Sequence, residues 1–357
     1  MAYSNRFDLA LAFAAQLHRN QTRKGKDVPY INHLMGVASL VGSFGGDEDQ
    51  VIAGLLHDSI EDCVDEMPEI RAHIDEKFGP RVLEIVEGCT DSDTLPKPPW
   101  AARKQTYLDH LHALPADSPT LLVSLCDKVY NARAIVADLE VEGDILWERF
   151  TAKRAGSLWY YRVLSNIFLH KKPGYLANEL KRLVDTMNAS GSTSGESKGD
   201  PLLYFFHGLE SGPHGSKYQR LCESNRVFSP DFQGMDVWER LDKIERETQG
   251  LRNLVIVGSS YGGLLASLFY SRNPERVRGL VLMAPALYQE ASDKVERMPE
   301  DAVVIHARQD DIVPIGPVRE KCAKHGIKII EVDDNHRLEK SHDLMLAGVQ
   351  KFLPPGA

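Results

Sequence analysis

The hydrophobic pattern of the chain changes its period near residue 200. Before that point, apolar positions recur every three to four residues, as Leu9, Phe13 and Leu17 do at the start, which is the period of a helix with one buried face. After it, short apolar runs alternate with segments of helical period. The first pattern predicts an all-α region, and the second predicts an α/β region whose mainly parallel sheet carries helices on its faces.

Glycine, proline and polar breaks divide each region into elements. We expect helices over residues 6–17, 32–44, 68–78, 81–89, 101–114, 121–139, 148–168 and 175–187, and a further helix that Asp47 caps and that carries residues 55–62. We expect strands over residues 202–206, 254–257, 279–283, 302–306 and 327–332, with helices over 263–270 and 343–352. No strand is expected before residue 190.

Length and local composition indicate two domains. A chain of 357 residues favours two domains over one. Residues 188–200 are mostly Ser, Gly and small polar types, which predicts a flexible linker. We therefore expect a multidomain chain with an all-α domain at 1–187 and an α/β domain at 201–357, and we expect the two halves to work separately.

Overall composition narrows the class of protein further. The formal net charge of −9 argues against non-specific binding to DNA or RNA. The five cysteines show no CxxC or paired spacing, which indicates reduced thiols. No apolar run approaches the roughly 18 residues of a membrane span, and the first residues lack the pattern of a secretion signal. We expect a cytoplasmic protein with no membrane partner, and the oligomeric state stays open.

Charged residues interrupt the buried stripe of the helix that Asp47 is expected to cap. His57 and Asp58 are followed one helical turn later by Glu61 and Asp62, so on a continuous helix the two pairs share one face. Such a cluster beside an apolar stripe is costly unless a metal or a reaction uses it. A hydrogen bond between His57 and Asp58 on the helix surface is the simpler alternative, but it leaves the second pair unexplained.

Two further candidate metal ligands lie in other segments. His33 follows Pro-Tyr-Ile-Asn at the start of one predicted helix, and Asp127 lies in another, four residues before Asn131. Together with His57 and Asp58 they make a set of two imidazoles and two carboxylates. Such a set suits Mn, Fe or Zn and leaves positions open for water and a phosphate oxygen.

The motifs around these residues are similar to those of the HD-domain phosphohydrolases, specifically the hydrolase domain of the RelA/SpoT family and its small stand-alone relatives. The resemblance covers about residues 5–165. It rests on segments 18–24, 29–33, 57–62 (the HDxxED signature), 78–79, 90–91, 103–104 and 127–133. That family removes the 3′-pyrophosphate of guanosine tetra- and pentaphosphate, the alarmones of the stringent response, and uses Mn²⁺.

The resemblance assigns roles to individual residues. It implies that Mn²⁺, or another divalent transition metal, is held by His33, His57, Asp58 and Asp127. It implies that Glu61 and Asp62 carry the catalytic step and that the nucleotide is contacted by Arg23, Lys24, Asn131 and Arg133. Arg23 and Lys24 read equally well as a solvated loop, and a basic patch there would offset the net negative charge.

A second group of candidate catalytic residues lies after residue 200. Ser260 stands in Gly-Ser-Ser-Tyr-Gly between a predicted strand and a predicted helix, which is the context of a nucleophile elbow. Asp310 and His336 follow later strands in the order Ser, Asp, His that a catalytic triad of this kind shows. The backbone N–H groups of Tyr261 and Leu209 are the expected oxyanion donors.

Residues 201–355 resemble the α/β-hydrolase superfamily, in particular its small bacterial esterase-like members. The resemblance implies that Ser260 is the nucleophile, that Asp310 orients and that His336 is the base. Asp311 and His342 lie close enough in sequence to leave those two assignments open. No lid-sized insertion is visible, which favours a small ester or thioester over a long-chain lipid, and a silent fold used for binding is the alternative.

We interpret the chain as a bifunctional hydrolase that joins an HD metal phosphohydrolase to a serine esterase-like domain. Its expected partners are a nucleotide and a small ester or thioester, with no DNA, RNA or membrane. One alternative is a broader nucleotide phosphohydrolase, such as one acting on NADPH. Another is a nucleotide-sensing HD module that gates the esterase half.

Overall fold

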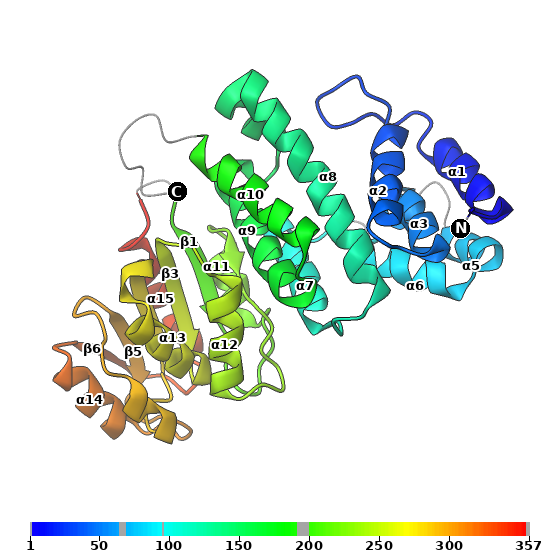
Figure 1. Cartoon of the computed structure of the whole chain (residues 1–357). Helices are drawn as coiled ribbons and strands as arrows, with labels where there is room; N and C mark the ends of the chain where they lie inside the picture. The colour runs from blue at the N-terminus through cyan, green and yellow to red at the C-terminus, as the bar shows by residue number, and fades with distance from the viewer. Residues whose placement is uncertain (1, 64–68, 95, 191–199, 355–357) are drawn as a thin grey trace. The chain divides into compact units, whose positions relative to one another are not determined.

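A computed structural model describes residues 2–63, 69–94, 96–190 and 200–354. The chain divides into two compact units, Met1–Ser197 and Lys198–Ala357 (Figure 1). Of the predicted linker, residues 188 and 189 belong to a helix instead, and residues 191–199 lie outside the described residues, as does residue 68 of a predicted helix. In the described part of the chain, no helix is long and apolar enough to cross a membrane.

The first unit is built from helices, as the period of its apolar positions predicts. The helices are α1 Asn5–Leu17, α2 Ile31–Ser43, α3 Glu48–Leu56, α4 Ser59–Cys63, α5 Ile70–Phe78, α6 Pro80–Cys89, α7 Trp100–Ala113, α8 Pro119–Glu142, the 3₁₀ helix η1 Gly143–Arg149, α9 Lys153–Lys171 and α10 Tyr175–Ala189. Within residues 2–63, 69–94 and 96–190, strand-type pairing is limited to an isolated bridge between Thr22 and Pro29.

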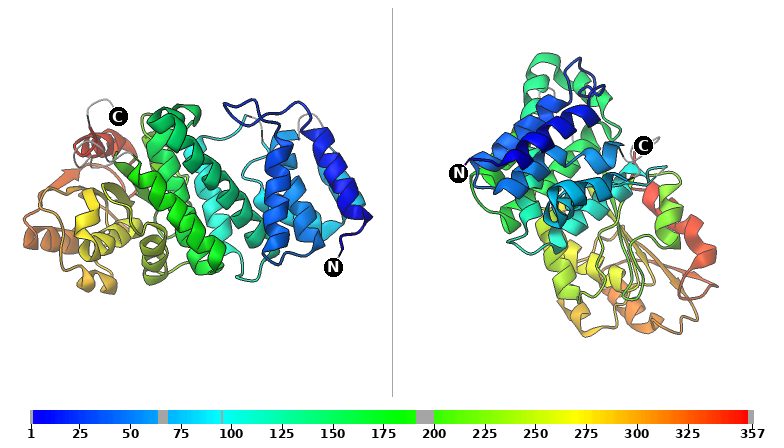
Figure 2. Two further views of the ribbon diagram at one scale, coloured as in Figure 1. Left: turned by 45° about the horizontal axis from the view of Figure 1, so that its top comes forward. Right: turned by 90° about the vertical axis from the view of Figure 1, so that its right-hand side faces the viewer.

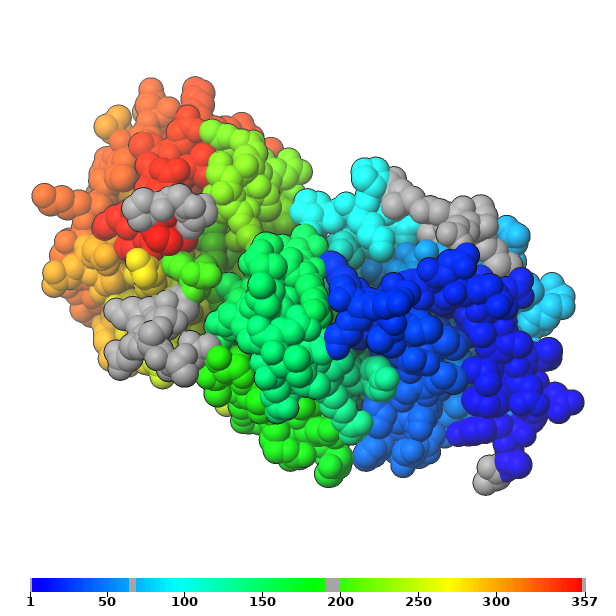
Figure 3. Space-filling view, turned by 90° about the horizontal axis from the view of Figure 1, so that it is seen from above, coloured from blue at the N-terminus to red at the C-terminus, as the bar shows by residue number. Residues whose placement is uncertain are grey.

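The long helix α8 and the short helix α3 form the centre of this unit. Helix α8 packs against α2, α3, α6 and α10, and its first half is buried on every side from Thr120 to Asp127. All residues of α3 from Val51 to Leu56 are buried, which a helix tolerates only where apolar neighbours surround it. Helix α1 lies at the outside of the unit, against α2 and α3 (Figure 3).

Two predicted helices of this unit are interrupted. The expected continuous helix through residues 55–62 is wrong, because α3 ends at Leu56 and α4 begins at Ser59. At this break a side chain bonds a backbone carbonyl of α3: Ser59 Oγ donates to the Leu56 carbonyl at 2.5 Å. The helix expected over 148–168 begins only at Lys153, because residues 148 and 149 belong to the 3₁₀ helix η1.

The second unit is a parallel sheet with helices on both faces, which confirms the α/β prediction (Figure 2). Its strands are β1 Leu202–Phe206, β2 Val227–Phe228, β3 Leu254–Ser259, β4 Val277–Met283, β5 Val303–Ala307 and β6 Ile329–Val332, in the order β2-β1-β3-β4-β5-β6. The helices are α11 Ser216–Cys222, α12 Val237–Glu247, α13 Tyr261–Arg272, α14 Ile315–Lys324 and α15 His342–Gln350, with 3₁₀ turns η2 Pro274–Arg276, η3 Glu290–Lys294 and η4 Glu339–Ser341.

The parallel topology determines where the second candidate site lies. Strands β1, β3, β5 and β6 run in the same direction, so their carboxyl ends meet at one edge of the sheet. Ser260 follows β3, Asp310 follows β5 and His336 follows β6. Such an edge is where ligands bind in open α/β sheets.

Candidate functional site

The first candidate site lies where the helix through the HDxxED signature breaks. Asp47 caps the start of α3 through a capping box with Gln50, and the break after Leu56 presents His57 and Asp58 from a turn. His33 comes from the first turns of α2 and Asp127 from the buried half of α8. The break therefore lets adjacent residues face two other helices, which a continuous helix would not allow.

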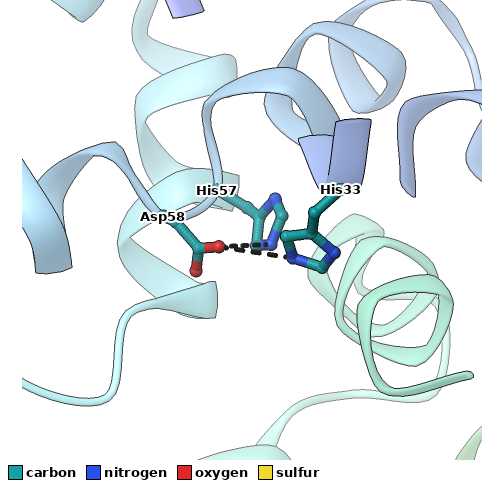
Figure 4. A group of neighbouring side chains, drawn as sticks. All are labelled: His33, His57 and Asp58. Atoms are coloured by element: carbon teal, nitrogen blue, oxygen red, sulfur yellow. Dashed lines mark ion pairs between the residues drawn. The ribbon is translucent and has the colours of Figure 1, made fainter. Parts of the chain in front are cut away.

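The four predicted ligands converge on one another, and Figure 4 shows three of them, His33, His57 and Asp58. Nε2 of His57 lies 3.1 Å from Oδ2 of Asp58 and 3.6 Å from Oδ1 of Asp127. Nε2 of His33 lies 3.4 Å and 3.3 Å from the same two oxygens. The side chains of His33, His57 and Asp127 are 0%, 2% and 7% exposed, whereas that of Asp58 is 21% exposed. Solvent or a substrate therefore reaches the cluster from the Asp58 side.

The hydrogen bonds around the cluster fit a divalent metal. Nδ1 of His57 bonds the Gly54 carbonyl at 2.9 Å, so that nitrogen is the donor and Nε2 keeps its lone pair. The buried Nε2 atoms of His33 and His57 have no hydrogen-bond partner in the described part of the chain. Lone pairs that face carboxylates across 3.1–3.6 Å repel unless a cation lies between them. His33, His57 and Asp58 have the spacing of a metal site, and a histidine ligand held by a backbone carbonyl is typical of one.

Neighbouring side chains orient the two carboxylates. The Tyr30 hydroxyl donates to Oδ2 of Asp58 at 2.7 Å. Asp127 accepts from Nδ2 of Asn131 at 2.5 Å and from Nζ of Lys128 at 2.6 Å. Each carboxylate is therefore held in one rotamer by partners outside the ligand set, which raises the precision of the site.

Electrostatics keep the cluster ready for a cation. Burial opposes ionisation of both carboxylates, but His57 and His33 lower the pKa of Asp58 well below its usual value. Lys128 and the two histidines do the same for the pKa of Asp127. Burial likewise opposes charge on His57, yet Asp58 and Asp127 raise its pKa well above the ordinary value. Asp58 and Asp127 therefore favour a positive charge next to Nε2 of His57, which a bound metal ion would supply.

The predicted catalytic carboxylates lie on α4, next to the ligands. Nε2 of Gln21 donates to Asp62 at 2.8 Å, and His18 bonds Gln21 at 2.6 Å. Lys97 donates to Glu61 at 3.1 Å. Burial, reinforced by Asp91, raises the pKa of Glu61, and burial, reinforced by Asp58, raises the pKa of Asp62.

The four residues predicted to contact the nucleotide differ in their partners and in their exposure. Arg23 donates to Oδ1 of Asn131 at 2.6 Å, so these two lie together beside Asp127. Lys24 is exposed. Arg133 instead forms a bidentate pair with Glu179 of α10, at 2.7 and 3.0 Å. Arg133 therefore ties α8 to α10, and a role in binding substrate would require that pair to open.

Sequence reasoning missed several residues at this site. Tyr30, Gln21, Lys97 and Lys128 were not assigned roles, although three of them lie inside the segments that carry the resemblance. Their position in those motifs was the available signal, since each stands within a few residues of a predicted ligand or contact. Lys97 carried no such signal, because it comes from a Pro-rich loop.

The second candidate site begins with a strained turn at Ser260. Its φ of +54° and ψ of −116° are a conformation that costs about 1–3 kcal/mol and is usually tied to function. Glycines make the turn possible: a Cβ on Gly262 would lie 2.0 Å from the Phe206 carbonyl oxygen, and one on Gly258 would lie 2.5 Å from that of Gly262. The turn projects Ser260 at the carboxyl edge of the sheet.

The structure brings three predicted residues together at this turn. Nε2 of His336 lies 3.2 Å from Oγ of Ser260. Nδ1 of His336 lies 2.8 Å from Oδ2 of Asp310, which is fully buried as a side chain. Of the two neighbouring aspartates, Asp310 is therefore the one that bonds His336. His342, the alternative histidine, is the first residue of α15. The arrangement has the order and contacts of a nucleophile, a base and an orienting acid.

The two predicted oxyanion donors belong to segments that flank Ser260. Tyr261 is the first residue of α13. Leu209 follows β1, and the Cβ position of the adjacent Gly208 lies 3.7 Å from Cβ of Ser260. Tyr261 therefore follows the serine directly, and the loop that carries Leu209 passes close to it.

Comparison with known proteins gives the same division of the chain. Residues 10–158 match the family described as HD domain, and residues 205–302 match the family described as alpha/beta hydrolase fold. The guanosine-3′,5′-bis(diphosphate) 3′-pyrophosphohydrolases MESH1 of Xenopus tropicalis and Homo sapiens are 42% and 41% identical over 127 and 128 residues. Each alignment covers 35% of this chain and 66% of the relative. The chain thus spans slightly less than two thirds of these relatives' length.

Solved structures resemble each half separately. A metazoan orthologue of SpoT that hydrolyses ppGpp is 26% identical and covers 52% of this chain and 97% of its own, with a TM-score of 0.43. A protein of the alpha/beta hydrolase superfamily from Xanthomonas campestris pv. campestris is 25% identical and covers 43% of this chain and 94% of its own, with a TM-score of 0.37.

Proposed function

We propose that this chain, which joins an HD domain with MESH1 homologues to an alpha/beta hydrolase fold domain, carries two hydrolase activities. The first removes the 3′-pyrophosphate of a guanosine nucleotide such as ppGpp and depends on Mn²⁺ or another divalent transition metal. The second is a serine hydrolase that cleaves a small ester or thioester. The observation that carries the first is the convergence of His33, His57, Asp58 and Asp127, where the two buried Nε2 atoms have no hydrogen-bond partner among the described residues.

In the first activity, His33, His57, Asp58 and Asp127 would hold a divalent ion, and that ion would supply Lewis-acid chemistry at the site. Glu61 and Asp62 position the water and accept its proton, since both lie on α4 directly beyond Asp58. Arg23 and Asn131 form the wall of the cluster beside Asp127 and contact the nucleotide. The water attacks the phosphorus bonded to the 3′ oxygen, the bond between them breaks, pyrophosphate is released and the 3′ oxygen takes up a proton.

In the second activity, Ser260 attacks the carbonyl carbon and gives its proton to Nε2 of His336. Asp310 holds Nδ1 of His336 and stabilises the imidazolium. The N–H groups of Leu209 and Tyr261 bind the developing oxyanion. His336 then protonates the leaving alcohol or thiol, and water releases the acyl group from Ser260.

The decisive experiment measures hydrolysis by the purified full chain, stripped of metal and then loaded with Mn²⁺. ppGpp, GTP and NADPH are offered, and their products are separated by chromatography. We expect Mn²⁺-dependent release of pyrophosphate from ppGpp, and none from the Asp127→Ala variant. Release of phosphate from NADPH in preference would favour the broader phosphohydrolase.

The same preparation tests the sensing alternative. The Mn²⁺-loaded chain is given a p-nitrophenyl ester in the presence and absence of ppGpp. Binding of ppGpp without turnover, together with altered ester hydrolysis, would favour an HD module that gates the esterase half. Full turnover of ppGpp in the metal-stripped protein would contradict the proposal.

A further inference from the structure

A fully buried arginine lies behind the turn that follows β1. Arg240 of α12 is 0% exposed, and its bonds run to backbone carbonyl oxygens. Its Nε donates to Met235 at 3.0 Å, and its NH1 group donates to His207 at 3.2 Å and to Gly208 at 3.3 Å. Its NH2 group has no hydrogen-bond partner in the described part of the chain. Burying a cation in this way is costly, which indicates that the buried guanidinium has a specific role.

His207 bonds the same peptide oxygen as Arg240 does. Its Nε2 accepts a hydrogen bond from the Phe232 N–H at 2.9 Å, so the ring proton resides on Nδ1. Nδ1 therefore donates to the Gly208 carbonyl at 2.8 Å. Burial lowers the pKa of His207, which keeps the ring neutral and this tautomer in place. The Gly208 oxygen thus receives two hydrogen bonds, one from His207 and one from Arg240, and its peptide has a single orientation.

The orientation of that peptide determines where the Leu209 N–H points. In a trans peptide the carbonyl and the following N–H point in opposite directions. Because the Gly208 carbonyl points at Arg240, the Leu209 N–H points away from it. The positive charge of Arg240, next to the Gly208 carbonyl oxygen, also polarises the peptide and strengthens its N–H as a donor.

Arg240 contacts the other predicted oxyanion residue as well. Its guanidinium lies 5.0 Å from the centre of the Tyr261 ring, within the range of a cation–π contact. The Tyr261 hydroxyl in turn accepts from the Val237 N–H at 3.0 Å. Helix α12 therefore holds both Tyr261 and the loop of Leu209 through contacts one helical turn apart.

We propose that Arg240, together with His207, is a positioning residue for the oxyanion site of the serine hydrolase. It fixes the Gly208–Leu209 peptide against α12 so that the Leu209 N–H is already aimed when the tetrahedral intermediate forms. This inference rests on the proposed serine hydrolase function, and it assigns Arg240 no contact with the substrate.

Arg276 is the matched control, because it is a structural arginine far from Ser260. Its Nε donates to the Leu251 carbonyl at 3.2 Å, another of its groups donates to the Thr248 carbonyl, and it lies 5.0 Å from the centre of the Phe269 ring. These contacts repeat those of Arg240 in kind. They lie before β4 begins, however, at the edge of the sheet opposite Ser260.

The test compares Arg240→Met, Arg240→Lys and Arg276→Met in the full chain. Hydrolysis of p-nitrophenyl butyrate gives kcat and KM, and a trifluoromethyl ketone mimics the tetrahedral intermediate, with the matching methyl ketone as its ground-state partner. Loss of one oxyanion donor costs about 10²–10³ in kcat, so we expect Arg240→Met to lower kcat by about 10²-fold with little change in KM. The affinity for the trifluoromethyl ketone falls by a similar factor, and that for the methyl ketone does not.

The conservative variant and the control decide between positioning and folding. Arg240→Lys keeps a cation that reaches one carbonyl, so it recovers part of kcat, whereas Arg276→Met lowers the melting temperature without changing the ratio of the two ketone affinities. Should Arg240→Met fail to fold, Arg240→Lys and His207→Asn carry the test through the same ratio. Each preparation is first titrated with a fluorophosphonate that labels Ser260.

Two results would overturn the inference, and they are distinguishable. Variants of Arg240 that are labelled at Ser260 and keep the wild-type kcat and ketone ratio defeat this inference alone. A wild-type chain that neither reacts with the fluorophosphonate nor hydrolyses any ester defeats the proposed serine hydrolase and this inference with it.

Discussion

The Tyr30 hydroxyl donates a 2.7 Å hydrogen bond to Oδ2 of Asp58, the same oxygen that lies 3.1 Å from Nε2 of His57. One atom thus links a residue outside the ligand set to the candidate metal position. Burial, reinforced by Asp58, raises the pKa of Tyr30, so the hydroxyl remains a donor. Tyr30 therefore fixes which lone pair of Asp58 faces the two histidines.

Removing that donor should weaken metal binding without abolishing it. Partners that orient metal ligands typically contribute about 10–100-fold to metal affinity or activity, so we expect Tyr30→Phe to weaken Mn²⁺ binding within that range. Competition against a calibrated chelator measures the affinity. Tyr3→Phe is the control, because Tyr3 precedes α1 and stacks on Phe7, away from the ligand set. Equal Mn²⁺ affinity in wild type and Tyr30→Phe would mean that the Tyr30 hydrogen bond does not orient a metal ligand.

Removing a ligand should have a larger effect than removing its partner. His57→Ala and Asp127→Ala each delete a group at the centre of the cluster, and we expect both to lose stoichiometric Mn²⁺ and nucleotide hydrolysis. Metal content after gel filtration and product release are the two measurements. His73→Ala is the matched control, since His73 packs on Phe13 with ring centres 4.5 Å apart. Retained metal in both ligand variants would rule out this site.

Glu61 should be separable from the ligands by its effect on turnover alone. Glu61→Gln keeps the size of the side chain but removes the proton acceptor, so we expect Mn²⁺ to stay bound while kcat falls by about 10²-fold or more. Glu87→Gln is the control, because Glu87 pairs with Arg71 at 2.9 Å on the surface. If Glu61→Gln loses the metal instead, Glu61 is a ligand and not a proton acceptor.

Local sequence patterns predicted most elements because their causes are local. The strand over 202–206 is observed as Leu202–Phe206, since an apolar run between Pro201 and His207-Gly208 has clear ends. The capping role of Asp47 is observed for the same reason. The two-residue strand β2 was missed, because Val227–Phe228 is too short to show any period.

Features that depend on tertiary contacts could not be predicted from the sequence pattern. The spacing of His57 and Glu61 fits one continuous helix, and it does not reveal that the side chains of His57 and Ser59 bond the Gly54 and Leu56 carbonyls. The sequence does not reveal that Arg133 pairs with Glu179, because Glu179 lies on a different helix, α10. Arg240 lies in a charged segment that predicts an exposed face, and its burial depends on how α12 packs on the β1 turn.

The stability of the second unit should fall on mild acidification. Burial lowers the pKa values of both His207 and His306, so the folded unit stays unprotonated at these rings where the unfolded chain, with a histidine pKa of about 6.5, takes up protons. The unfolded state then binds more protons, and the free energy of unfolding decreases as pH falls below about 6.5.

Alkylation of a buried thiol measures this effect in the full chain. Cys322 of α14 is buried, so its modification by a brief pulse of thiol reagent in urea, read by mass spectrometry, reports unfolding of the second unit. We expect the urea midpoint to drop between pH 7.5 and pH 5.5, and to drop less in His306→Asn. An identical pH dependence in His306→Asn would show that His306 is not buried in its neutral form.

The two activities should be independent of each other. Each unit contains its own core and its own set of candidate site residues, with Asp127 in the first and Ser260 in the second. We therefore expect Ser260→Ala to abolish ester hydrolysis and leave nucleotide turnover unchanged, and Asp127→Ala to do the reverse. Both rates are measured on each variant, with Ser267→Ala, a buried serine that bonds the Gly263 carbonyl within α13, as the control. A change of more than about tenfold in the untouched activity, equivalent to about 1.4 kcal/mol of barrier, would mean that the units are coupled and would favour the sensing alternative.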